Sequence, residues 1–117
     1  MKKHIACVLA VLCSAASFQA WAGGSADAGK AAVEKFGCAA CHGKDFNTPI
    51  DPTYPKLAGQ HQDYLAHALI AYQRGADVLN GRSNAIMNGQ AKPLSKQDIQ
   101  NIAAYLHSLP GSLVLRK

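Results

Sequence analysis

The sequence of 117 residues lacks a membrane-length apolar run, a run of basic side chains and an internal repeat. Its extended apolar segment, IACVLAVLCSAASF from Ile5 to Phe18, is shorter than the roughly 20 residues that a membrane-spanning helix needs. Without a block of basic residues, nucleic-acid binding is not indicated. No segment alternates in the manner of a β-strand. We therefore expect a small helical protein without stable membrane insertion.

The N-terminal segment has the parts of a secretory signal peptide. Lys2 and Lys3 give a positive start, the apolar segment follows, and the sequence AWA ending at Ala22 is a small-x-small cleavage site. We expect residues 1–22 to be cleaved after Ala22, leaving a periplasmic domain of residues 23–117. That domain would carry ten basic and seven acidic side chains, a mild surplus that bears mainly on the rate of encounter with partners.

Cysteine is scarce in the expected exported domain, which keeps only Cys38 and Cys41 of the four. A disulfide between them would close a loop too short to constrain the unfolded chain much. A domain of this length buries only about 60–70% of its unfolded surface and is often marginally stable. Something other than disulfides must therefore complete the core.

Two helices are expected in the first two thirds of the chain. The segment SADAGKAAVEKFG predicts a helix with Ser25 as N-cap and Gly37 as its end. A second helix is expected from about Gln60 to Arg74, with Gly75 as its stop. Helical spacing predicts that its apolar face consists of Tyr64, Leu65, Ala68, Leu69 and Tyr72.

The segment SKQDIQNIAAYLHSLP predicts the last helix, where Ser95 and Asp98 resemble a capping box and Pro110 ends the helix. Its expected buried stripe is Ile99, Ile102, Ala103 and Leu106. Residues 41–60, with three prolines, and residues 75–93, rich in Gly and Asn, are expected to be irregular. Loops this long are unusual in a small domain unless they surround something, which indicates a cofactor.

The sequence Cys38-Ala-Ala-Cys41-His42 is the attachment signature of a c-type haem. Two thiols about one helical turn apart can form thioethers with two vinyl groups of one porphyrin, and the adjacent histidine can ligate the iron. A redox dithiol is an alternative, but it would expect a parallel βαβ context. A zinc site is another, but it would need four ligands.

The sixth iron ligand has one main candidate, Met87, the only methionine of the expected exported domain. It lies in the second irregular stretch, and thioether ligation would raise the reduction potential. His61, near the apolar face at the first turn of the second helix, is the alternative ligand. His67 and His107 are expected at the surface.

These residues resemble the small class I c-type cytochromes, in particular the single-haem bacterial periplasmic type related to one module of the di-haem cytochromes c. The resemblance covers Ser25 to Pro110 and is carried by CAACHG, YPKLAGQ, GRSNAIM and LSKQDIQNIAAYLHSLP. It implies an all-α fold with three to four short helices and long loops around one haem c, covalently attached through Cys38 and Cys41.

The resemblance also implies the roles of single residues. His42 and Met87 would be the axial iron ligands, the Pro55 carbonyl would accept a hydrogen bond from the His42 ring, and Leu57 would pack on the haem. The first and last helices would cross at Gly29, Phe36, Tyr105 and Leu106.

The function that follows is that of a non-enzymatic one-electron carrier without catalytic residues. By resemblance it would shuttle electrons between a quinol–cytochrome c reductase and a terminal oxidase or another periplasmic redox enzyme, as a monomer that forms transient complexes. The alternatives are a haem subunit of a larger redox complex and a haem sensor or enzyme with a labile sixth ligand.

Overall fold

The computed structural model describes residues 23–112, which contain helices and no strand. The helices are α1 (Ala26–Lys35), α2 (Ala39–His42), α3 (Gln62–Arg74), α4 (Ala85–Ala91) and α5 (Lys96–Ser108). The predicted all-α class is confirmed, with one helix more than the three to four expected in these residues. The predicted signal peptide, residues 1–22, lies outside the described residues.

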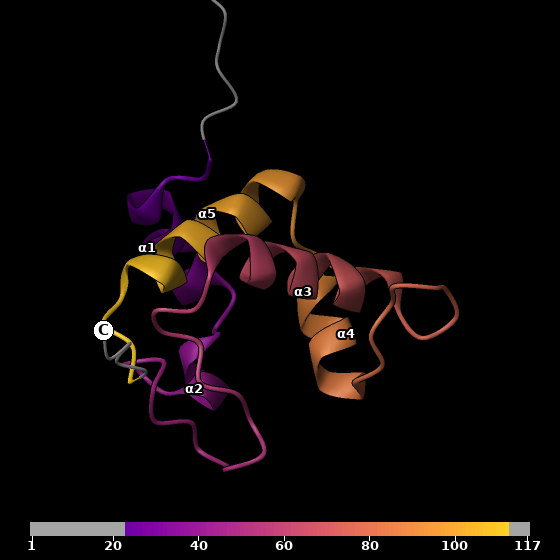
Figure 1. Ribbon diagram of the computed structural model, residues 1–117, viewed down its shortest axis with the longest axis horizontal. Helices are drawn as coiled ribbons and strands as arrows, with labels where there is room; N and C mark the ends of the chain where they lie inside the picture. The colour runs from indigo at the N-terminus through magenta and orange to yellow at the C-terminus, as the bar shows by residue number, and fades with distance from the viewer. Residues whose placement is uncertain (1–22, 113–117) are drawn as a thin grey trace, which may run out of the picture.

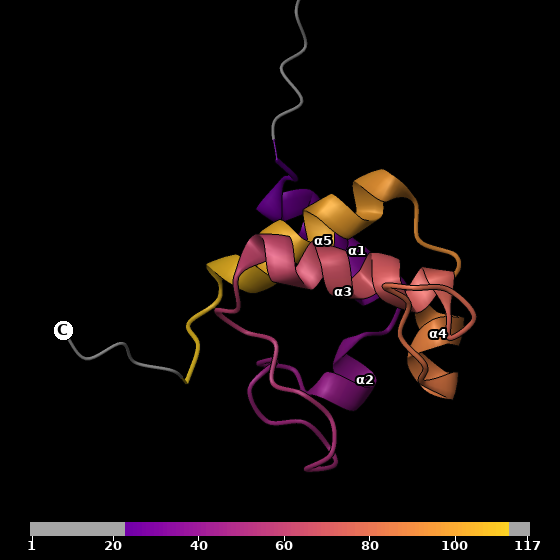
Figure 2. The same ribbon diagram turned by 45° about the vertical axis from the view of Figure 1, so that its right-hand side comes forward.

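The helices are arranged on two levels. In Figures 1 and 2, α1, α3 and α5 pack together in the upper part of the molecule, and α2 and α4 both lie below them. The long loop between α2 and α3 extends further down, beside α2. No helix within the described part of the chain has both the length and the apolar character needed to cross a bilayer.

The crossing of α1 and α5 depends on Gly29. A Cβ atom at this position would overlap the backbone carbonyl of Asn101 and lie 2.6 Å from the Cβ of Tyr105. Glycine inside a helix costs about 1 kcal/mol relative to alanine. Here it lets the two backbones approach closely, and the predicted contact with Tyr105 is confirmed.

Both predicted N-caps are confirmed. The Ser25 hydroxyl accepts a hydrogen bond from the backbone N–H of Ala28 at 3.3 Å. At α5, the Asp98 N–H donates to the Ser95 hydroxyl at 3.0 Å, and the Ser95 N–H donates to the Asp98 carboxylate at 2.9 Å. This reciprocal pair satisfies N–H groups that have no partner within the helix.

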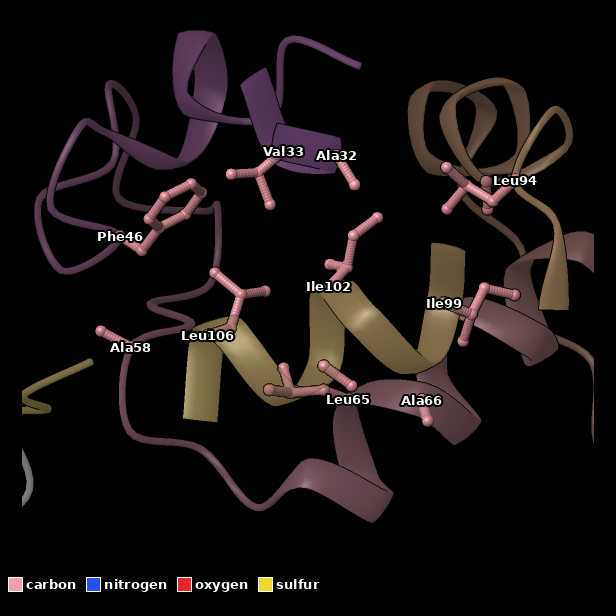
Figure 3. Packing of buried hydrophobic residues seen from close by; sticks show 12 residues of the cluster. Ala32, Val33, Phe46, Ala58, Leu65, Ala66, Leu94, Ile99, Ile102 and Leu106 are labelled. Atoms are coloured by element: carbon pink, nitrogen blue, oxygen red, sulfur yellow. The ribbon is translucent and has the colours of Figure 1, made fainter. Parts of the chain in front are cut away.

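The core lies between α1, α5 and α3. Figure 3 shows Ile102 of α5 facing Ala32 and Val33 of α1, while Leu65 of α3 lies on the other side of α5. Phe46, from the loop after α2, is 2% exposed. The α5 residues buried in this core are Ile99, Ile102, Ala103, Ala104 and Leu106, which includes the whole predicted stripe.

The buried face of α3 differs from the predicted one. Leu65 is buried as expected, but so is Ala66, which the prediction left out, and Tyr64 is 49% exposed. The reason is that Tyr64 interacts with the α3–α4 loop instead of the core: its hydroxyl accepts a hydrogen bond from Arg82 at 3.1 Å. The helix also begins two residues later than expected, so His61 precedes its first turn.

The prediction that residues 75–93 are wholly irregular is wrong. Residues 85–91 form α4, and Met87 lies on it. The helix forms because the Asn84 side chain accepts hydrogen bonds from the N–H groups of Ile86 and Met87, at 3.1 and 3.0 Å. This N-cap outweighs the low helix propensity of the asparagine and glycine that follow.

Candidate haem-attachment site

The Cys-x-x-Cys-His sequence folds as a short helix directly after α1. The Cys38 N–H donates to the Val33 carbonyl at 3.0 Å, and the His42 N–H donates to the Cys38 carbonyl at 3.2 Å. These bonds place Cys38 and Cys41 one helical turn apart. Both are free thiols and both are half-buried.

The environment of Cys38 does not suit a redox dithiol. Burial raises the pKa of the Cys38 thiol, with a smaller contribution from the neighbouring Cys41. Reactive cysteines in redox Cys-x-x-Cys motifs have a lowered pKa, which supplies the thiolate. The alternative of a thioredoxin-like dithiol is therefore disfavoured, as it is by the absence of strands in residues 23–112.

The His42 ring is buried and held by the backbone. Its Nδ1 lies 2.9 Å from the carbonyl oxygen of Pro55, and because a carbonyl oxygen can only accept, Nδ1–H donates this hydrogen bond. No hydrogen bond to Nε2 occurs within the described residues. The predicted hydrogen bond to Pro55 is thus present, and Nε2 remains available to bind a metal ion.

The long loop after α2 returns to bring Pro55 to His42. The Phe46 carbonyl accepts hydrogen bonds from the N–H groups of Leu57 and Ala58, at 2.8 and 3.1 Å. Because Phe46 is anchored in the core, these two bonds fix the returning part of the loop, and Pro55 lies two residues before Leu57. Leu57 itself is half-buried and packs against the core.

The beginning of this loop is held by Asp45. Its carboxylate accepts hydrogen bonds from the N–H groups of Asn47 and Thr48, at 2.9 and 2.8 Å, and from the Thr48 hydroxyl. These bonds, led by the one from Asn47, lower the pKa of Asp45. The turn therefore keeps its charge-assisted hydrogen bonds at neutral pH.

Met87 is half-buried on α4. Helix α4 lies on the same side of α3 as α2 in both views (Figures 1 and 2). The competing histidines differ from Met87. His61 and His67 are exposed, and the exposed His107 ring lies 2.8 Å from the Gln60 carbonyl through Nδ1. The surface positions predicted for His67 and His107 are confirmed.

The donor set suits haem better than a bare metal ion. No group of three or more His, Cys, Asp or Glu side chains in residues 23–112 could hold a metal ion. A closed zinc site, which needs four such ligands, is therefore not available there. Two unpaired thiols on one helical turn, next to an oriented imidazole, do fit a porphyrin that is attached through its vinyl groups and ligated by the ring.

Comparisons with known proteins agree with this geometry. The chain belongs to the cytochrome c family, whose model, described as "Cytochrome c", matches residues 26–110. Membership implies a covalently bound haem c, and the resemblance to class I c-type cytochromes is confirmed.

Two curated relatives and one solved structure show the degree of similarity. The chain is 44% identical over 98 residues to cytochrome c4 of Stutzerimonas stutzeri, covering 80% of this chain and 45% of that one. It is 42% identical over 86 residues to cytochrome c-554(548) of Halomonas halodenitrificans, covering 73% and 96%. The crystal structure of reduced cytochrome c4 from Pseudomonas stutzeri matches with a TM-score of 0.65 and 40% identity, over 77% of this chain and 48% of that one. The chain thus spans about half the length of the cytochrome c4 proteins it matches.

Several residues that build the site were not predicted from the sequence. Phe46 anchors the loop that carries Pro55, yet it lies in a segment without periodicity, where no pattern distinguishes it. Asn84 could have been found, because asparagine before a short apolar segment is a standard N-cap signal. Asn88 could not, because its side chain bonds to the carbonyls of Tyr72 and Arg82, 16 and 6 residues earlier, and no local pattern indicates such partners.

Proposed function

We propose that this protein carries single electrons on one haem c, attached through Cys38 and Cys41 and ligated by His42 and Met87. When bound, the haem supplies the iron that changes oxidation state. The observation that carries the proposal is the buried His42 ring, whose Nδ1 is engaged by Pro55 while Nε2 stays free. An imidazole held in this way is a well-oriented ligand.

The residues around the iron would favour electron transfer over catalysis. With His42 and Met87 filling both axial positions, a substrate would have no open position on the iron. Leu57 would cover part of the haem surface and help exclude water. The protein would then act as a carrier and not as an enzyme.

Met87 is favoured over the histidines as second ligand for two reasons. It is half-buried on α4, which lies on the same side of α3 as α2, the helix that ends at His42, whereas His61 is exposed and precedes α3. The remaining histidines, His67 and His107, are also exposed.

The compartment and the partners that we propose for this carrier are based on the predicted signal peptide and on the family. Residues 1–22 would direct export to the periplasm and be removed after Ala22, leaving residues 23–117 as a monohaem domain. The domain would exchange electrons as a monomer, in transient complexes with a quinol–cytochrome c reductase and with a terminal oxidase or another periplasmic redox enzyme. A haem subunit of a larger redox complex is the second candidate. Co-purification would separate the two.

The test is a visible and near-infrared spectrum of the purified holoprotein, oxidised and then reduced. We expect a c-type reduced spectrum and, in the ferric state, a methionine-to-iron charge-transfer band. The band should disappear in Met87→Ala and persist in the control Ile86→Ala, the neighbouring residue on α4, which is 49% exposed. A high-spin ferric wild type without the band would overturn Met87 ligation and favour a sensor or enzyme with an open site.

A further inference from the structure

Helices α3 and α4 are joined by a side-chain amide from each. The Asn88 side chain of α4 donates through Nδ2 to the carbonyl of Tyr72 at 2.6 Å and to the carbonyl of Arg82 at 2.9 Å. Its Oδ1 accepts from the Asn84 N–H at 2.7 Å. This single amide therefore ties α4 to the last turn of α3 and to the loop between them.

Hydrogen bonds in the opposite direction, from a side chain of α3 to the backbone at the end of α4, come from Gln73, the residue next to Tyr72. Its Nε2 donates to the carbonyls of Ala91 and Leu94, at 2.9 and 2.7 Å. Tyr72 lies in the last turn of α3 and Ala91 is the final residue of α4, so their carbonyls have no partner within their own helices. Each helix thus caps the C-terminal end of the other. We call the pair Asn88 and Gln73 the amide clamp.

Helix α4 has little else to fix its position. It has seven residues, too few to be stable in isolation, and among them only Ala91 is buried. Apolar packing along most of its length is therefore small. The clamp holds this region at Asn88, at Ala91 and at Leu94, and Met87 directly precedes Asn88 on α4.

The loop that carries one of the bonded carbonyls is itself held against α3. The Arg82 N–H donates to the Ala71 carbonyl at 2.9 Å. The Arg82 guanidinium lies 5.3 Å from the Tyr64 ring centroid and 5.6 Å from that of Tyr72, in cation–π contact. Asn88 therefore bonds to a fixed part of the structure, and its bonds can transmit that rigidity to α4.

We propose that the amide clamp holds the Met87 sulfur on the haem iron, with Asn88 and Gln73 acting as positioning residues for the sixth ligand. This inference rests on the proposed ligation by Met87. Without the clamp, α4 can move away from α3, and the fraction of molecules with methionine dissociated from iron increases. The clamp therefore sets how readily an external ligand gains access to the iron.

The first experiment measures imidazole binding to the ferric holoprotein. The apparent affinity for a ligand that binds only the methionine-dissociated state is proportional to the population of that state. Asn88→Ala and Gln73→Ala each remove two bonds to backbone carbonyls, so each should tighten imidazole binding about tenfold or more. Gln90→Ala is the matched control, because Gln90 is exposed on α4 and makes no side-chain hydrogen bond within the described residues. It should leave imidazole binding within about twofold of wild type.

A second variant separates positioning from general stability. Asn88→Asp keeps the shape and the acceptor for Asn84 N–H, but an ionised carboxylate cannot donate to either carbonyl. The methionine-to-iron band of Asn88→Asp should be weak at pH 8. It should strengthen as the pH falls through the titration range of the carboxyl group, because the protonated form regains a donor. Asn88→Ala should show no such recovery.

The outcomes distinguish this inference from the proposed function. A wild type that lacks the methionine-to-iron band would overturn Met87 ligation, and the clamp's role with it. A wild type with the band, but with Asn88→Ala and Gln73→Ala binding imidazole like Gln90→Ala, would overturn the clamp alone. The clamp alone would also be overturned if Asn88→Asp showed only a lower free energy of unfolding, with no pH-dependent change in the band.

Discussion

The pair α1–α5 and the segments that carry the candidate ligands are held in different ways. Between α1 and α5, apolar side chains such as Ile102 and Val33 interlock, and Gly29 brings the backbones together. Around His42 and Met87, the contacts that fix position are hydrogen bonds between single groups and the backbone.

The difference separates two tasks within one small domain. Apolar packing is non-directional, and it supplies most of the free energy of folding without fixing a single atom to a given point. Hydrogen bonds are directional and contribute about 1 kcal/mol each, so they orient a ring or a helix at low total cost. Substitutions in the first region should lower the stability of the whole domain, whereas those in the second should mainly change the ligation of iron.

The largest effect is expected at Ile102, which is 2% exposed in the middle of α5. Ile102→Ala leaves a cavity in the core and should lower the free energy of unfolding by about 3 kcal/mol. Urea unfolding followed by circular dichroism measures it, with Ile50→Ala as control because Ile50 is 71% exposed. The ferric spectrum should not change below the unfolding transition. A spectral change without loss of stability would contradict the division between the two regions.

The same substitution made in each region gives the sharpest comparison. Gly29→Ala forces a Cβ against the Asn101 carbonyl, and should lower the free energy of unfolding by about 2 kcal/mol while the spectrum stays as in wild type.

Gly43→Ala should cost a similar amount, about 2 kcal/mol, for a different reason. Gly43 has φ of 83°, where a side chain is strained, and its Cβ would overlap the Thr48 carbonyl. Because Gly43 follows His42 directly, this variant should also alter the haem spectrum. Gly89→Ala is the control: no heavy atom lies within 4 Å of its Cβ position, so stability should rise by up to about 1 kcal/mol. Equal haem spectra for Gly29→Ala and Gly43→Ala would contradict the proposed difference between the α1–α5 pair and the segments that carry the candidate ligands.

The smallest effect is expected at the N-terminus of α5. Ser95→Ala removes the cap and should lower the free energy of unfolding by about 1 kcal/mol at pH 7, whereas Ser83→Ala, an exposed control, should change it little.

This effect depends on pH through Asp98. Hydrogen bonds from the Ser95 hydroxyl and N–H lower the pKa of Asp98. Because the pKa of Asp98 is lower in the folded than in the unfolded protein, where it is about 3.9, the ionised carboxylate stabilises the fold at pH values above the unfolded-state pKa. This stabilisation is lost as the pH falls through the folded-state pKa. The difference between wild type and Ser95→Ala should therefore narrow between pH 5 and pH 3 in parallel urea titrations. A difference that stayed constant over this range would show that the carboxylate does not take part.

The sequence predicted the scaffold well because its signals are local or periodic. The caps at Ser25 and Ser95 and the stripe that includes Ile102 depend on neighbours within one or two helical turns. The haem motif was predictable for the same reason, since its three residues lie within five consecutive positions at a fixed spacing.

The parts that were missed depend on contacts between distant residues. The residues of helix α4 were predicted to be irregular because their composition is unfavourable for a helix. The Gln73 side chain that bonds to the carbonyls at its end lies 18 and 21 residues before them in sequence. The α3 face was partly wrong because Tyr64 pairs with Arg82, 18 residues later. Periodicity within one helix contains no information on such partners.

The hydrogen bond between His42 and Pro55 has a consequence for the coupling of electrons to protons. Its acceptor is a peptide carbonyl, which neither gains nor loses a proton across the range in which proteins are folded. A carboxylate in that place would titrate and would make the electron-donating strength of the imidazole vary with acidity. The Pro55 carbonyl also cannot be removed by changing a side chain, because every amino acid at position 55 has the same backbone carbonyl oxygen. The acceptor that orients the His42 ring is therefore independent of pH over that range and of the side chain at position 55.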